Sequence, residues 1–483
     1  MSPICCSSVL RLIGRLDSPN CHFYQGGNLQ TLGTIAPMQL GLTRQDSRFQ
    51  DEGETVARQI GLRKLGHKLS SAHIRPWLIP GLYAFGAIAT GFTIPRITTI
   101  FLPQFVSTMS VGAAIGIYSA IASGMIALTG IVFSLAFVMI QFSTAAYSPR
   151  LGLWIARDPI VSHALGIFTA TFFYALTALA WVDRGGSGRV QLSGVWIVAV
   201  LLFASIAMII TLIHRIGMLQ VNRMLIFTGD QGREIIANLY PPIETPPALS
   251  FGEVDRRACT QTILHHGKPV VLQAIDVSIL AQLASRTNSV IEVVAAVGDS
   301  VLDSTPILRV LGGNRPLPPA DLLDAIEVGG ERTFEQDPKY AIRLLVDIAI
   351  KALSSAINDP TTAVQALDQI EDLLLRLGRR RLEIGAFRDH DAKLRVLIAF
   401  PSWEDFLLLA FDEIRFCGAR SVQVMRRMKA LVREMISVLP EERHAALRCW
   451  QERLQSTVDE AFGNAQDKLE ASTADRQGLG ITR

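Results

Sequence analysis

Two short clusters in this sequence carry side chains that could bind a metal ion or move a proton. His265 and His266 are adjacent, and neighbouring side chains on a strand point to opposite faces, which disfavours joint binding of one metal. The run from Asp389 through His390 to Asp391 follows a basic segment, which favours a solvated turn. The sequence contains no Walker loop, nucleophile elbow or paired zinc motif. We therefore expect no catalytic residue, no cofactor and no metal, and we predict that the protein is not an enzyme.

A third pattern has the chemistry of a pore rather than of an enzyme. Residues 97–149 contain no Asp, Glu, Lys, Arg or His. Small and polar residues recur there at steps of three or four, which places them on one face of a helix. We call five of them the polar stripe: Gly116, Ser123, Gly130, Ser134 and Gln141. In lipid, such a face either lets another helix approach closely or faces water in a pore, and the sequence leaves both alternatives open.

The elements that must position the polar stripe are membrane-spanning helices. The chain has 483 residues, 49% of them hydrophobic, and a mean hydropathy of +0.31, which is typical of a membrane protein rather than a soluble one. Four apolar segments are long enough to cross a bilayer, and we place them at residues 77–97, 111–142, 160–182 and 192–213. A helix continuing from 111 to 148 would be roughly 57 Å long, beyond a core of about 30 Å. The second span must therefore project, kink or begin as a re-entrant piece.

The distribution of basic residues indicates the orientation of these spans. Ten Lys and Arg residues lie beside the spans on the side of the two termini, against three on the other side. Basic residues are concentrated on the cytoplasmic side of membrane proteins. We therefore predict a multi-pass protein with both termini in the cytoplasm.

The second half of the chain is charged like a cytosolic domain. Strand-like runs at residues 269–275, 290–297 and 307–311 surround a short helix at 277–284, and amphipathic helices follow. The expected fold class is a four-span α-helical membrane domain, then a small β module and a cytoplasmic helical bundle. We divide the chain into a mobile leader (1–73), a transmembrane domain (74–216), a linker (217–250), the β module (251–315), a helical domain (316–463) and a loose tail (464–483).

Helix starts in the cytoplasmic half follow one recurrent pattern. Asp337 with Pro338, and Asp359 with Pro360, each combine a capping residue with a first-turn proline. The run Asn358, Asp359, Pro360 and Thr361 is a candidate cytoplasmic motif, although capping explains Asp359 without any ligand. Further helices are expected at residues 403–416, 422–438 and 441–462.

Four stretches of the chain are similar to one uncharacterised bacterial family of predicted membrane proteins that carries a domain of unknown function. They lie at residues 134–150, 273–276, 332–338 and 354–363. The resemblance covers nearly the whole chain after the leader. It implies a protein of the bacterial inner membrane with this architecture, and it supplies no activity.

Two functional hypotheses follow from these patterns. The absence of carboxylates from the predicted spans disfavours proton- or sodium-coupled transport. The first hypothesis is therefore an ion or small-solute channel, assembled as a homo-oligomer and gated by its cytoplasmic half. The second is a membrane-anchored sensor or scaffold whose cytoplasmic helices bind a protein partner. The lipid bilayer is an expected partner in both cases, and nucleic acid is not, since no basic patch is interleaved with aromatic residues.

Overall fold

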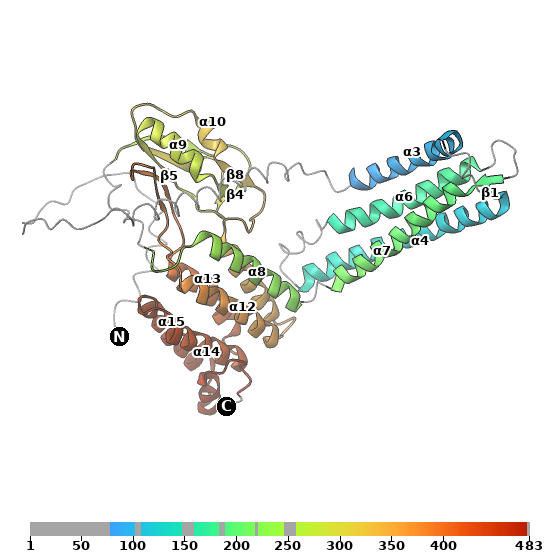
Figure 1. The fold of residues 1–483 in the computed structure, drawn as a ribbon. Coiled ribbons are helices and arrows are strands. Elements are labelled where there is room, and N and C mark those ends of the chain that lie inside the picture. The colour runs from blue at the N-terminus through green and yellow to red at the C-terminus, as the bar shows by residue number, and fades with distance from the viewer. Residues whose placement is uncertain are drawn as a thin grey trace, which may run out of the picture.

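The computed structural model describes residues 78–101, 108–146, 159–182, 189–217, 221–245 and 257–480. The described chain has two distinct halves. A group of long helices, lying side by side, extends from one side of a region made of a β module and a helical domain (Figure 1). The predicted leader, residues 1–73, lies outside the described residues.

This group consists of four apolar helices whose bounds follow the predicted spans closely. They are α3 (Leu78–Phe101), α4 (Val111–Ala146), α6 (Pro159–Trp181) and α7 (Leu192–Gly217). Three of them, α4, α6 and α7, are long and apolar enough to cross a membrane, and α3 contributes a shorter apolar stretch, Leu78–Ile94. The structure thus contains three candidate membrane spans where the sequence predicts four.

Helix α6 is the centre of this group because it packs along α3, α4 and α7. Its buried side includes Phe168, Thr171 and Tyr174. Thr171 and Ser205 share a hydrogen bond of 3.0 Å that joins α6 to α7. At the end of these helices that lies away from the helical domain, β1 (Thr108–Ser110) pairs antiparallel with β2 (Arg189–Gln191) and connects α4 to α7 (Figure 1).

A helix occupies most of the segment that the sequence suggested as a linker. This helix, α8 (Val221–Leu239), follows α7 and buries one side that includes Leu225, Gly232 and Ile236. It packs on two helices of the helical domain. The predicted linker of residues 217–250 is therefore largely a structural connection, because these apolar residues recur at helical spacing.

The β module consists of two small sheets and two short helices around one core. One sheet has the strand order β3-β7-β5-β10-β9 and the other β6-β4-β8. The elements are β3 (Cys259–Leu264), β4 (Val270–Ile275), α9 (Val277–Thr287), β5 (Ser289–Val293), β6 (Ser300–Val301), β7 (Pro306–Gly312), α10 (Pro319–Asp324) and β8 (Ile326–Gly329). The three predicted strand runs and the helix between them are confirmed by β4, β5, β7 and α9.

The sheet also recruits two strands from much later in the chain. These are β9 (Ala386–Arg388) and β10 (Leu394–Ile398), and β10 pairs parallel with β5. They lie inside the range 316–463 that we expected to be helical. No local pattern predicts this pairing, because a short apolar run does not reveal its partner strand.

The helical domain contains α11 (Pro338–Ala352), α12 (Pro360–Gly378), α13 (Trp403–Gly418), α14 (Val422–Val438) and α15 (His444–Ala461). The expected helices are confirmed within a few residues. Helices α12, α13 and α14 begin with a side-chain cap from Asp359, Ser402 and Ser421, and at α13 Ser402 and Asp405 form a reciprocal capping box. A large core built from all five helices and α8 holds the domain together.

The expected loose tail is ordered instead. Residues 465–472 form α16 (Ala465–Ser472), which packs on α14 and α15. Arg426 of α14 donates a hydrogen bond from Nε to the carbonyl of Glu470 at 2.6 Å. Most of the tail is polar and exposed, and it is attached by Ala471, which is buried in the core of the helical domain, together with backbone and charged groups.

Candidate functional site

The polar stripe lies on the outer face of α4. All five of its residues, Gly116, Ser123, Gly130, Ser134 and Gln141, are exposed in the single chain. Bulky apolar residues flank it and are exposed as well, including Ile126 at 60% and Phe133 at 60%. The polar stripe is thus a narrow band of small and polar side chains between two rows of apolar side chains.

The residues that attach α4 to its own chain lie on the other side of the helix. Ala114, Tyr118, Met125 and Val132 are buried against α6 and its neighbours. At 100° per residue, this packed face and the polar stripe are centred roughly 170° apart. Close packing within the chain therefore does not explain the stripe.

Glycines make the same distinction more sharply. A Cβ atom added at Gly112, Gly116, Gly124 or Gly130 of α4 would meet nothing within 4 Å. By contrast, a Cβ at Gly166 of α6 would lie 2.7 Å from the Tyr83 ring. The chain's own close contacts thus use other glycines than those of α4.

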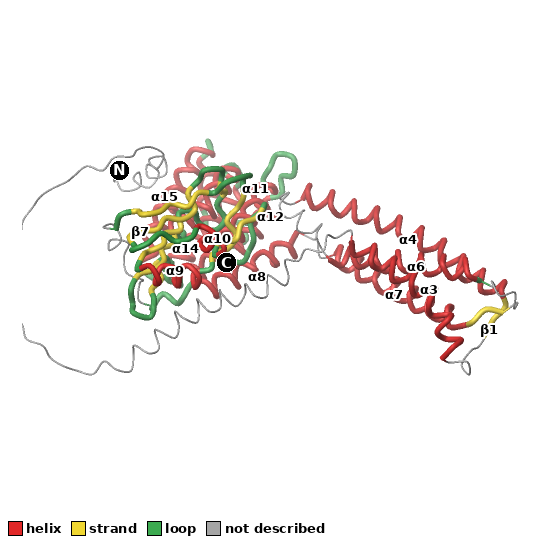
Figure 2. Tube along the Cα trace, turned by 90° about the horizontal axis from the view of Figure 1, so that it is seen from above, coloured by secondary structure: helices red, strands yellow, loops and turns green. Residues whose placement is uncertain are grey.

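Helix α4 also reaches the helical domain in the second half of the chain. It is one uninterrupted helix of 36 residues, about 54 Å long at 1.5 Å per residue, which exceeds a bilayer core of about 30 Å. Of the possibilities left by the sequence, the structure shows projection: α4 contacts α11, and Figure 2 shows it running from β1 to the helical domain. The polar stripe and the helical domain are therefore mechanically connected.

The candidate cytoplasmic motif forms the turn between α11 and α12. Asn358 adopts a left-handed conformation (φ 49°), and Asp359 caps α12 by accepting hydrogen bonds from the Thr362 backbone at 3.1 Å and hydroxyl at 2.6 Å. These bonds lower the pKa of Asp359; the Thr362 hydroxyl makes the largest contribution. Pro360 occupies the first turn, while Asn358 and Thr361 are exposed. The structure assigns Asp359 the capping role that its sequence context predicts.

Two other stretches of the family pattern meet where the β module joins the helical domain. Gln336 uses its side-chain amide to bond the backbone of Ile275, accepting from N at 3.0 Å and donating to O at 3.3 Å. Gln273 donates to the carbonyl of Glu331 at 2.6 Å. The segment before α11 is thus attached to the β4 strand by the side chains of Gln273 and Gln336, which bond backbone groups as a neighbouring strand would.

A buried ion pair lies at the centre of this junction. The Asp337 side chain is 1% exposed, and Arg332 donates from Nε to its Oδ2 at 2.7 Å. Burial raises the pKa of Asp337, and the neighbouring Arg332 guanidinium opposes that rise. Gly298, at φ 90°, leaves space for the carboxylate, since an added Cβ would overlap Oδ2. Any side chain at position 298 would displace the pair.

Sequence reasoning missed the role of this pair and of Tyr240. We interpreted Asp337 only as a helix start, yet its side chain makes no capping bond to α11. Tyr240, just after α8, is 1% exposed, and both burial and Asp337 raise the pKa of its hydroxyl. Among the described residues, the Tyr240 hydroxyl, Asp337 Oδ1 and the Thr333 hydroxyl are buried without a hydrogen-bond partner. The only sequence signal was a charged pair, Arg332 and Asp337, inside a recurrent motif.

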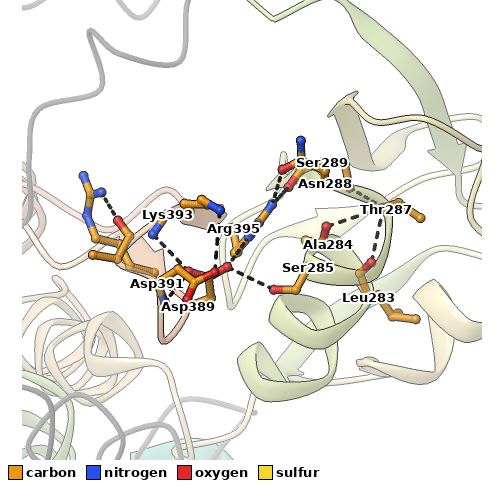
Figure 3. A network of polar contacts seen from close by, with 12 residues as sticks. Leu283, Ala284, Ser285, Thr287, Asn288, Ser289, Asp389, Asp391, Lys393 and Arg395 are labelled. Carbon is orange, nitrogen blue, oxygen red and sulfur yellow. Dashed lines mark hydrogen bonds and ion pairs between the residues drawn. The ribbon is translucent and has the colours of Figure 1, made fainter.

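The two clusters that suggested metal or acid–base chemistry have structural surroundings. Asp389 accepts a hydrogen bond from Arg395 Nε at 2.6 Å and bonds from the backbones of Asp391 and Lys393. Arg395 also reaches the Asn288 side chain at 3.1 Å, which locks the β9–β10 turn to the end of α9 (Figure 3). His265 bonds the Lys268 carbonyl at 2.8 Å in the exposed β3–β4 turn. Over the described ranges, no group of three or more His, Cys, Asp or Glu residues is arranged to hold a metal.

Comparison with known proteins identifies relatives but no activity. A family model described as "Predicted membrane protein (DUF2254)" matches residues 74–434, from before α3 into α14. Uncharacterised proteins of Mycobacterium bovis and Mycobacterium tuberculosis are each 28% identical over 379 residues, covering 74% of this chain and 70% of the relative. No solved structure matches. The model match includes the polar stripe, the junction and the α11–α12 turn, whereas α15, α16 and the tail lie beyond it.

Proposed function

The chain belongs to the DUF2254 family of predicted membrane proteins, and from this premise we propose that it is a homo-oligomeric channel for ions or small solutes. In this proposal, α3, α4, α6 and α7 each cross the bacterial inner membrane, with both termini in the cytoplasm. The fourth crossing, α3, rests on its apolar sequence and its packing along α6. No enzymatic activity is proposed.

One observation carries the channel proposal. The polar stripe of α4 is exposed on the single chain and lies nearly opposite the face that packs on α6. Exposure of Ser134 to acyl chains would leave its hydroxyl group in a medium without hydrogen-bond partners of its own. Water in a pore, or α4 of another copy, supplies such partners.

The path requires several copies of the chain. The four helices cluster around α6, whose side toward them is filled by residues such as Phe168 and Tyr174. A ring of copies that turned their α4 helices inward would bring the polar stripes together around an axis. Hydroxyl, amide and glycine surfaces would then line the path without a buried charge.

The contact between α4 and α11 supports gating by the cytoplasmic half. Helix α11 is packed in the middle of the helical domain, with Leu344, Leu345 and Ile348 almost inaccessible. Because cores of this density transmit displacement rather than absorb it, a shift of the helical domain would move the cytoplasmic end of α4.

Reconstitution into planar bilayers tests the proposal. We expect unitary conductance steps from the full chain, altered by Ser134→Val and Gln141→Leu. Phe133→Leu, on the exposed apolar border, is the matched control and should leave conductance unchanged. Absence of conductance at every voltage, membrane tension and pH, from a protein shown to be inserted and oligomeric, would contradict a channel.

The alternative, a membrane-anchored sensor or scaffold, is favoured by one feature of the cytoplasmic surface. Phe416 of α13 is 78% exposed, and exposed aromatic side chains are common anchors in protein interfaces. If this alternative holds, Phe416→Ser should abolish capture of a stoichiometric cytoplasmic protein while membrane insertion remains. Capture that survives deletion of all residues after Asp337 would count against it.

A further inference from the structure

A large polar groove lies at the C-terminal end of the helical domain. It has a volume of about 1290 Å³ and is bounded by α14, α15 and the tail that follows α16. For comparison, small-molecule sites typically occupy about 300–1,000 Å³. The groove therefore has room for a complete organic ligand.

The two helices present matched faces to the groove. Lys429 and Arg433 are one turn apart on α14, and Arg448, Glu452 and Gln455 follow at helical spacing on α15. Residues three or four apart lie on one face of a helix. These side chains therefore converge on the same space from opposite walls.

The tail that follows α16 forms the third wall of the groove. Asp475 accepts hydrogen bonds from the backbones of Gln477 and Gly480 at 3.2 and 2.7 Å, which fold the tail into a compact turn. Gly478 adopts φ 70°, and a Cβ there would overlap the Gln423 carbonyl of α14. A side chain at position 478 would therefore force this wall away from α14.

Positive charge in the groove is available to a ligand. Arg476 is already paired with Glu434 of α14, and the Asp475 carboxylate accepts the backbone bonds of the tail. Arg433 and Arg448 are exposed and make no hydrogen bond, ion pair or ring contact with any described residue. Lys429 bonds Gln455 across the groove, and partial burial lowers the pKa of Lys429. Two unoccupied guanidinium groups thus face a cavity beside a partly desolvated ammonium group.

We propose that this groove binds a soluble organic phosphate of nucleotide size, with Arg433 and Arg448 on its phosphate oxygens. Guanidinium groups bind phosphate through two parallel hydrogen bonds, which gives them an advantage over single ammonium groups. A soluble ligand is favoured over a lipid headgroup, since α14 and α15 lie on the side of the body away from α3, α4, α6 and α7 in both views (Figures 1 and 2). This inference is independent of the channel proposal, because it concerns a different surface.

Isothermal titration of the full chain in nanodiscs tests the inference. The probes are ATP without magnesium, sodium pyrophosphate and, as a carboxylate polyanion, citrate. We expect saturable binding of ATP with a stoichiometry of one per chain and weaker binding of pyrophosphate. Citrate at the same concentrations should not bind.

Variants locate the site and keep the test decisive. The double change Arg433→Gln and Arg448→Gln should weaken ATP binding at least about tenfold, which corresponds to about 1.4 kcal/mol. Arg433→Lys retains the positive charge but loses the guanidinium group that makes two parallel hydrogen bonds, and it should weaken ATP binding to an intermediate extent. Arg420→Gln and Arg286→Gln remove exposed arginines outside the groove and should have no effect. Unchanged thermal unfolding verifies that each variant is folded.

Three results would overturn the inference. They are ATP binding that the double change leaves intact, citrate binding as tight as ATP binding, and tighter binding of a DNA or RNA oligonucleotide than of ATP. The last result would instead identify the groove as part of a nucleic-acid surface.

Discussion

The half with the apolar helices and the half that follows it place their polar residues in opposite ways. In the second half, the motif residues Arg332, Gln336 and Asp337 point inward and are bonded to the protein. In the first half, the polar stripe of α4 points outward, and its glycines meet no neighbour. The first set holds one chain together, whereas the second is available to something outside it. Substitutions in the two sets should therefore differ in what they damage.

The largest expected effect is on the buried ion pair of the junction. Asp337→Ala should lower the free energy of unfolding by about 3 kcal/mol, because it leaves Arg332 without its counterion and opens a cavity. The double change Arg332→Met and Asp337→Leu should recover much of this loss, since no uncompensated charge remains. Urea unfolding of the detergent-solubilised chain, followed by the fluorescence of Trp403 and Trp450, measures both. Equal losses in the single and double variants would show that the charges are not coupled.

Helix packing in the half with the apolar helices gives the next largest effect. Gly166→Val places atoms against the Tyr83 ring, which already lies 2.7 Å from the position of a Cβ. Overpacking of this kind costs about 1–3 kcal/mol, and we expect earlier thermal unfolding in detergent. Gly130→Val on the open face of α4 is the matched control, and should leave the unfolding of the single chain almost unchanged. A similar loss in both variants would remove the distinction between packed and open glycines.

The candidate cytoplasmic motif should show a smaller, purely structural effect. Asp359→Ala removes the cap of α12 and should cost about 1 kcal/mol, while Thr361→Ala, at an exposed position, should be neutral. Unfolding in urea compares the two. If Asp359→Asn retained full stability but abolished conductance, the motif would have a functional role beyond capping.

The pH dependence of stability separates two kinds of carboxylate. The pKa of Asp337 is raised in the folded chain above its ordinary 3.8, so the folded state binds a proton more tightly than the unfolded state. Its contribution to stability should therefore rise as the pH falls through the window between the raised value and 3.8. The pKa of Asp359 is lowered, so its contribution is present above 3.8 and is lost as the pH falls through its lower folded value.

Comparison of variants isolates each of these contributions. Urea midpoints from about pH 8 to about pH 2 should show the first slope in the wild type and its loss in Asp337→Asn. Asp359→Asn should remove only the opposite, more acidic contribution. A pH profile of Asp337→Asn that superimposes on the wild type would show that Asp337 does not titrate in this window.

The sequence predicted most elements but not their long-range partners. Periodicity and capping located α4, α11 and α12 because those signals are local. The pairing of β10 with β5 joins segments about a hundred residues apart, and nothing local encodes it. Likewise, the even spacing of the polar stripe predicted one face of α4 but not whether α6 covers that face. That question depends on which side of α4 presents Tyr118 and Met125 to the other helices.

The site was predictable only where its residues act locally. Asp359 was identified as a cap from its neighbours, but Asp337 carries a similar Asp-Pro signature and is instead held by Arg332. The difference arises from the β module, where Gly298 leaves a buried space for the carboxylate of Asp337. Tyr240 had no sequence signal, because its burial is produced by Phe400 and Phe406 from another part of the chain.

The most direct test of the central claim is cysteine accessibility along α4 in native membranes. In a chain whose six cysteines are replaced by serine, Ser123→Cys, Gly130→Cys and Ser134→Cys should react with a charged, membrane-impermeant thiol reagent. Ile126→Cys and Phe133→Cys, on the exposed apolar borders, should react at least about tenfold more slowly, since lipid excludes the reagent. Modification at position 134 should also reduce conductance. If the stripe cysteines resist the charged reagent but react readily with a lipid-soluble maleimide, the polar stripe faces lipid and the channel account is contradicted.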